Sequence, residues 1–250
     1  MTQPNAIMRP RGEHPISFKP EMIRAIIAGR KTQTRRLINP QPAPTCGVDR
    51  QVNGWLWPHK SRHNPKSKFH GVGIARPVAN FKERMMQFYP YGIPGDKLWV
   101  REVFAELGTW ERRAIGQTGD AENVWEGLRK YQYPSTMKEN TLISAGKEYW
   151  RTFPSIHMPR EASRMDLMNL NGWCERLWEI DQAGCIAEGC YTIGRNGYRY
   201  DETAGGVYQT PLDAYRALWD TIATEDGTTW ADNPWVWVAE FQPERVEHAA

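Results

Sequence analysis

Apolar residues recur at helical spacing near the start of the chain. Residues 20–28 carry one apolar stripe, made of Met22, Ile23, Ile26 and Ile27. Pro20 suits the first turn of a helix, where its missing N–H is no loss, and Gly29 is a natural stop. We therefore predict a helix over about 20–28.

A second helix is predicted in "TPLDAYRALWDTIA". Thr210 stands at the N-cap position. One face of this stretch is apolar and carries Leu212, Tyr215, Leu218, Trp219 and Ile222. The stretch "DQAGCIAEGC" indicates a short turn or helix that ends at Gly189.

Alternating apolar and polar residues predict strands in "ISF", "KTQTRRL", "DKLWVREVF" and "NPWVWVAEF". Shorter strand-like pieces, broken by Pro159 and Gly172, follow residue 153. Residues 38–92 and 106–150 show no sustained period, and we interpret them as two long loop insertions. Short strands, two framework helices and long loops predict an α+β fold with a small barrel or curled sheet, in one domain over 1–250.

Composition excludes several classes of protein. A chain of 250 residues, 40% apolar and with twelve tryptophans, is an ordinary globular chain. No apolar run approaches the roughly 20 residues of a membrane span, and the first residues lack the core of a signal peptide. We expect a cytoplasmic protein without a membrane partner.

The four cysteines form no C-x-x-C pair and do not suggest a disulfide scaffold. Cys46, His59, His63 and His70 would suit zinc only if they converged, and their turn-rich segment favours coincidence. We therefore expect neither a metal nor a cofactor.

Charge is distributed unevenly along the chain. Residues 1–90 hold 16 basic and 4 acidic residues, a balance of +12, whereas residues 91–250 have a balance of −9. A basic segment is typical of a protein that meets phosphate, in a nucleotide or a nucleic acid. Solvated loop charges would give the same count, so both interpretations stay open.

The stretch "GRKTQTRR" at 29–36 has the strongest chemical character. It places Lys31 and Thr34 among three arginines directly after the first predicted helix. A strand with solvated charges explains the pattern as well as a reactive site does.

The order of these motifs resembles the ASCH domain family of the PUA-like superfamily. "ISF", an apolar helix and "GRKTQTRR" are followed by "GDKLWVRE", "LWEIDQAGCIAEG", a second helix and "WVWVAEF". The stretch "SIHMPREASR" is similar to larger members carried by bacteriophages, which would place the protein in the host cytoplasm. The resemblance covers about 14–37, 93–105, 153–190 and 208–242, and it implies a small β-barrel.

Small bacterial members of the family are amidohydrolases that remove the acetyl group from N4-acetylcytidine. The resemblance therefore implies an amidohydrolase acting on an acylated pyrimidine nucleoside or nucleotide, with Lys31, Thr34 and Glu188 as catalytic residues and Arg36 at the substrate. Other members bind modified bases in DNA or RNA without catalysis, or cleave RNA, and both alternatives stay open.

Hydrolysis of an amide needs a nucleophile, a base and a proton donor. We expect Thr34 to attack, Lys31 to take its proton and Glu188 to protonate the leaving amine. In an alternative mechanism that uses the same three residues, Glu188 activates water directly. Neighbouring arginines and partial burial beside the end of the helix would both lower the pKa of Lys31. In an ideal strand residues 31 and 34 face opposite sides, so Lys31 would have to lie in the turn after Gly29.

Further polar residues are weaker candidates for the same cleft. Arg101 and Glu102 in "WVRE", and His157, Arg160 and Arg164 in "SIHMPREASR", would hold a phosphate or the edge of the base. Each is equally suited to a structural ion pair or hydrogen bond. The acyl group, the sugar and the oligomeric state are not determined by the sequence.

Overall fold

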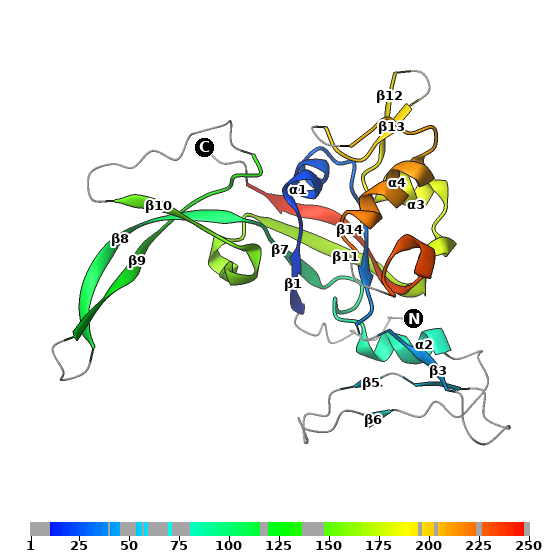
Figure 1. Cartoon of the computed structure of the whole chain (residues 1–250), viewed down its shortest axis with the longest axis horizontal. Helices are drawn as coiled ribbons and strands as arrows, with labels where there is room; N and C mark the ends of the chain where they lie inside the picture. The colour runs from blue at the N-terminus through cyan, green and yellow to red at the C-terminus, as the bar shows by residue number, and fades with distance from the viewer. Residues whose placement is uncertain are drawn as a thin grey trace, which may run out of the picture. The chain divides into compact units, whose positions relative to one another are not determined.

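The computed structural model describes residues 11–39, 41–45, 54–56, 58–59, 70–71, 81–115, 120–136, 148–194, 197–202, 205–223 and 227–247. Over these residues the fold is α+β, with many more residues in strands than in helices (Figure 1). The predicted fold class is confirmed at this level.

The largest sheet has five strands in the order β1-β7-β11-β14-β2. Their bounds are β1 (Glu13–Ser17), β2 (Gln33–Leu37), β7 (Lys97–Arg101), β11 (Met165–Arg176) and β14 (Trp235–Val246). β1 is parallel to β7, while β11 is antiparallel to β7 and β2 to β14. The sheet ends at β1 and β2, so the sheets of the described residues do not close into the barrel that the resemblance implied.

A second sheet has the order β10-β8-β9 and consists of β8 (Phe104–Ile115), β9 (Asp120–Gln132) and β10 (Tyr149–Phe153). The prediction of irregular structure over 106–150 is therefore wrong for these strands. Charged residues occupy both faces of much of the β8–β9 hairpin, which hides the period of two. Cross-strand pairs such as Trp110 and Trp125, with ring centroids 5.4 Å apart, hold the strands in register.

Three short pairs complete the strands: β3 (Ala43–Thr45) with β4 (Gly54–Leu56), β5 (Pro58–His59) with β6 (His70–Gly71), and β12 (Tyr191–Ile193) with β13 (Gly197–Arg199). The segment 38–92 otherwise contributes α2 (Phe81–Met85) and lies largely outside the described residues. Cys46 and His63 of the candidate zinc set are among those outside.

Both framework helices are confirmed. α1 (Pro20–Ile27) buries Met22, Ile23 and Ile26, and Gly29 follows it with φ of 70°. α4 (Pro211–Asp220) begins after Thr210, whose hydroxyl accepts a hydrogen bond from the Asp213 N–H. Its buried face is made of Ala214, Tyr215, Leu218 and Trp219, and the predicted members Leu212 and Ile222 are exposed.

The predicted strand break at Gly172 is wrong, because β11 runs through it. A Cβ atom at this position would overlap the ring of Tyr89, whose hydroxyl donates to the Val238 carbonyl at 3.0 Å. Glycine therefore serves close packing here rather than a turn.

The chain divides into two compact units. Unit 1 comprises residues 1–29, 96–168 and 243–250, and unit 2 comprises residues 30–95 and 169–242. β11 and β14 contribute residues to both. The prediction of one domain stays a prediction.

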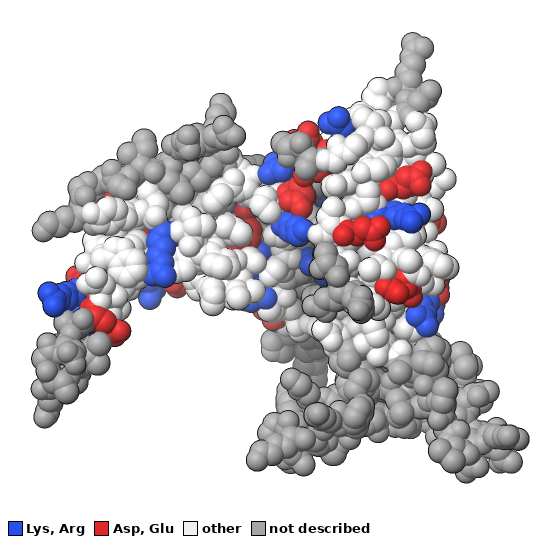
Figure 2. All heavy atoms as spheres, viewed as in Figure 1, with Lys and Arg blue, Asp and Glu red and all other residues white. Residues whose placement is uncertain are grey.

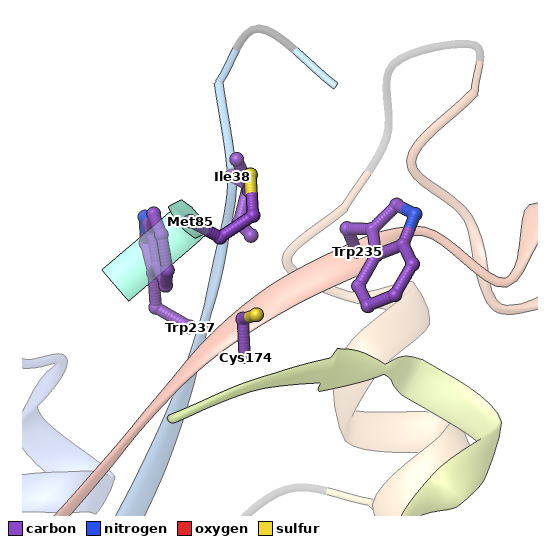
Figure 3. Close-up of a cluster of buried hydrophobic side chains, with 5 residues drawn as sticks. All are labelled: Ile38, Met85, Cys174, Trp235 and Trp237. Atoms are coloured by element: carbon purple, nitrogen blue, oxygen red, sulfur yellow. The ribbon is translucent and has the colours of Figure 1, made fainter. Parts of the chain in front are cut away.

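Unit 2 has a core cluster built from β11, β14, α2 and the residue after β2, shown in Figure 3 and made of Ile38, Met85, Cys174, Trp235 and Trp237. A cluster in unit 1 joins Phe104, Met158 and Ala162. No helix in the described part of the chain has the length and apolar character needed to cross a membrane.

Basic and acidic side chains are interspersed on the face shown in Figure 2. Seven of the sixteen basic residues in 1–90 lie outside the described residues: Arg9, Arg50, Lys60, Arg62, Lys66, Lys68 and Arg76. Both interpretations of the basic segment, phosphate contact and solvated loop charge, therefore stay open.

Candidate functional site

Lys31 lies in the short connection between α1 and β2. The positive φ of Gly29 turns the chain out of α1, with the Gly29 N–H donating to the Ile26 carbonyl at 2.9 Å. The neighbouring Thr32 N–H donates to the Ala187 carbonyl at 2.8 Å. Backbone hydrogen bonds therefore fix Lys31 beside the end of α3 (Gln182–Ala187).

Glu188 is placed by α3. Asp181 caps this helix, its carboxylate accepting from the Gly184 N–H at 2.7 Å. The Glu188 N–H donates to the Gly184 carbonyl at 2.9 Å, and Gly189, with φ of 109°, turns the chain away. Glu188 thus closes the helix with its side chain buried.

Lys31 and Glu188, 157 residues apart in the chain, form a buried pair. The Lys31 Nζ donates to the Glu188 Oε2 at 2.5 Å and to the Glu188 backbone carbonyl at 2.8 Å. The Lys31 side chain has 0% of its surface exposed and that of Glu188 has 3%. The sequence-based pairing of these two residues at one place is therefore seen in unit 2.

Arg35 and Glu175 extend this pair. The Arg35 guanidinium donates to the Glu175 Oε1 at 2.8 Å and lies 3.4 Å from the Glu188 Oε1. Gly184 makes room for it, since a Cβ atom there would stand 3.0 Å from an Arg35 nitrogen. Two cations and two carboxylates therefore balance each other in the interior. We call Lys31, Arg35, Glu175 and Glu188 the buried network.

Two aromatic residues complete the hydrogen bonding of the carboxylates. Trp173 donates its indole N–H to the Glu175 Oε2 at 2.7 Å, and the Tyr215 hydroxyl lies 3.4 Å from the Glu188 Oε1. Burial raises the pKa of Tyr215 well above its ordinary value, so the hydroxyl stays a donor.

Burial is the main cause of a lowered pKa at Lys31. Removal from water disfavours the ammonium form, Glu188 acts in the opposite direction, and the charge of Arg36 adds to the lowering. The predicted direction agrees with this result, and of the two predicted causes burial has a larger effect than the charge of Arg36.

Thr34 and Arg36 lie on the other face of β2 from Arg35. Successive strand residues point to opposite faces, and Arg35 points toward Glu175 and Glu188. Arg36 is paired in register with Trp237, a member of the core cluster in Figure 3. Thr34 is buried and paired with Ala239. The structure therefore joins Lys31 to Arg35 rather than to Thr34.

The sequence interpretation missed Arg35, Glu175 and Tyr215. The signal for Arg35 was present, because residues 31, 33 and 35 share a face in an extended chain. Glu175 and Tyr215 carried no comparable signal, since only the packing of β11 and α4 brings them to Glu188.

The weaker candidates belong to unit 1. Glu102 is buried, and its two carboxylate oxygens accept from Arg164 at 2.8 and 3.1 Å and from the Ser135 hydroxyl. The Arg164 guanidinium also covers the Tyr133 ring at 4.2 Å. These contacts tie the end of β7 to the start of β11.

Arg101 and Arg160 approach the Trp99 ring, at 5.7 and 5.8 Å from its centroid. Arg160 also pairs with Glu13 and Asp166, each at 2.9 Å. His157 is exposed and lines a cavity of about 610 Å³ in unit 1. Their predicted role in binding substrate stays a prediction, as do those of Glu102 and Arg36.

Within the part of the chain that the structure describes, no cluster of three or more histidine, cysteine, aspartate or glutamate side chains is arranged to hold a metal ion. No family model, no curated protein and no solved structure matches this chain.

Proposed function

We propose that the chain is an ASCH-type amidohydrolase with a PUA-like ancestry, which removes an acyl group from the exocyclic amine of a pyrimidine nucleoside or nucleotide. The observation that carries the proposal is the 2.5 Å contact between the Lys31 amine and the Glu188 carboxylate. These are two of the three residues for which the resemblance implies catalysis.

The geometry favours the variant in which water attacks. Thr34 faces away from Arg35 and Glu188 on β2, whereas the Glu188 carboxylate and the Lys31 ammonium adjoin each other. Glu188 takes a proton from a water molecule, and the oxygen of that water forms a bond to the acyl carbon. The C–N bond then breaks, and Lys31 donates a proton to the departing nitrogen.

The same contact resets the pair. After the amine and the carboxylic acid have formed, Glu188 holds one extra proton and Lys31 lacks one. Transfer from the carboxyl to the amine across 2.5 Å restores both groups. Because burial lowers its pKa, Lys31 is a stronger proton donor than an ordinary lysine.

The test is the conversion of N4-acetylcytidine to cytidine, and of its deoxy analogue to deoxycytidine. Chromatography measures the products. We expect turnover that is lost in Lys31→Met and Glu188→Gln and retained in Thr34→Val. Lys82→Met is the matched control, because Lys82 forms an exposed pair with Glu179 at 2.7 Å in the same unit.

Loss of activity in Thr34→Val with an unchanged fold would restore Thr34 as the nucleophile. Full activity in Lys31→Met would refute the proposed site. Absence of turnover, together with binding of DNA or RNA that weakens steeply as salt rises, would favour the non-catalytic binder.

A further inference from the structure

The cavity in unit 1 lies on one face of the β10-β8-β9 sheet, outside the buried network. Its volume of about 610 Å³ falls within the range of sites for nucleotide-sized molecules. The residues that decide its chemistry are Phe104, Glu106, Tyr131, Arg151, Phe153 and His157.

Aromatic rings form one wall of this cavity. Phe104 and Phe153 are stacked with centroids 5.3 Å apart and 18° between their planes, and the Tyr131 ring meets Phe104 edge-on at 5.9 Å. Tyr131 is half-buried, so part of its ring stays accessible, whereas the Phe153 ring is already stacked on Phe104 and covered by the Arg151 guanidinium. Such a wall suits a planar ligand that stacks.

Glu106 and Arg151 face each other across β8 and β10 without forming an ion pair. They are directly paired in register, which puts both side chains on one face. The Arg151 guanidinium instead covers the rings of Phe153 at 4.9 Å and Trp110 at 5.1 Å. The Arg151 guanidinium donates no hydrogen bond to another described side chain and thus directs its donors to none of them.

A β-bulge fixes the carboxylate of Glu106. The register shifts after Leu107, leaving Leu128 and Arg129 unpaired, and Arg129 adopts a φ of 55°. This turns the Arg129 N–H toward the Glu106 Oε1 at 3.3 Å. A side chain at Gly127 would overlap the Glu106 carboxylate. A strained arginine and a glycine thus hold one carboxylate in the cavity, a combination typical of binding sites.

We propose that this cavity binds a purine base and prefers guanine. A carboxylate accepts the paired N1–H and N2–H donors that guanine presents on one edge. A guanidinium donates to the O6 and N7 acceptors on its other edge. Adenine lacks the paired donors, and the aromatic wall stacks on the ring of either purine. Arg129, Arg151, Glu106 and Glu161 balance in charge, so the base rather than its phosphate is recognised.

The test is calorimetric titration of the full chain with GMP, AMP and CMP, and with single-stranded oligonucleotides that contain or lack guanine. We expect saturable binding of GMP at least tenfold tighter than that of AMP or CMP. Glu106→Gln and Arg151→Met should each weaken it at least tenfold. Arg113→Met is the control, because Arg113 is an exposed residue of the same hairpin that pairs with Glu126.

Tighter binding of the guanine-containing strand than of GMP would identify a single strand as the natural source. Equal binding would identify the free nucleotide, and both results support the proposal. The proposal would be overturned if neither GMP nor the guanine-containing strand bound saturably. It would also be overturned if Glu106→Gln and Arg151→Met, with native circular dichroism, bound GMP as the unmodified chain does. Binding of GMP and turnover of N4-acetylcytidine are separate measurements on the same unmodified chain, so the two proposals succeed or fail independently.

Discussion

A lysine amine that is removed from water keeps its charge only beside an anion, and Lys31 has both a carboxylate and a carbonyl of Glu188 within hydrogen-bonding distance. The pair is thus held by two hydrogen bonds to one residue. In the proposed mechanism, the protonation state of this pair determines when the site can react.

The pH dependence of turnover distinguishes the two mechanisms. If water attacks, Lys31 must be protonated, so kcat falls as pH rises through its pKa. Because burial lowers that pKa, we expect the fall to begin at a lower pH than the titration of an ordinary lysine would give. If Thr34 attacked with Lys31 as base, kcat would rise over the same range. The measurement is kcat for N4-acetylcytidine from neutral pH upward, with circular dichroism at each pH to verify the fold.

The free energy of unfolding reports the cost of breaking the buried pair. Lys31→Met leaves the Glu188 carboxylate without its closest cation, and we expect a loss of about 3–5 kcal/mol in urea unfolding. The double variant Lys31→Met/Glu188→Leu should recover part of this loss. Lys82→Met, which breaks an exposed pair, should cost less than about 1 kcal/mol. Equal losses of stability in Lys31→Met and Lys82→Met would contradict a strongly coupled pair in the interior.

At the scale of elements, α3 carries Glu188 at its end and depends on one cap. This helix has six residues, and the Asp181 carboxylate binds the Gly184 N–H at its start. A helix this short is stabilised by its cap and its packing rather than by its own propensity.

We expect Asp181→Ala to cost about 1 kcal/mol in stability and to lower kcat, because the position of Glu188 depends on α3. Asp181→Ser, which keeps a capping oxygen, should retain most of both. Thermal melts and kcat for the two variants measure the effect. An unchanged kcat in Asp181→Ala would show that packing alone positions Glu188.

The elements that the sequence predicted correctly are those with a clear buried apolar surface. α1 and α4 have clear apolar stripes, whereas the first five residues of β14 are apolar and buried on both faces of the strand. The β8–β9 hairpin was missed because both of its faces carry charges, so that burial imposes no period. Gly172 was interpreted as a break because the ring of Tyr89 that fills its place comes from a distant segment. Arg35 was derivable from alternation, whereas Glu175 and Tyr215 required the tertiary fold.

At the scale of the whole molecule, the two units are interleaved in the chain. Unit 1 takes three separate segments and unit 2 takes two. No fragment shorter than residues 1–250 therefore contains all of unit 1. Residues 243–250 belong to this unit.

Removal of residues 243–250 should destabilise unit 1. Arg245 lies 3.1 Å from the buried Asp166 and donates to the Ser163 carbonyl at 2.7 Å, and the Glu247 N–H donates to the Arg164 carbonyl at 3.0 Å. We expect a chain ending at Gln242 to lose about 1–3 kcal/mol, since buried acceptors lose partners. Arg245→Met, which keeps the backbone, should lose less. A thermal melt identical to that of the full chain would refute this contribution.

The separation of Lys31 and Glu188 in the chain has a consequence in time. At a synthesis rate of roughly 5–20 residues per second, the 157 residues that follow Lys31 up to and including Glu188 take about 8–31 s to add. Throughout that interval the lysine has no carboxylate to accompany it into the interior, and it must stay hydrated on the nascent chain. Unit 2 therefore closes around its charged centre only late in synthesis, after α3 has left the ribosome.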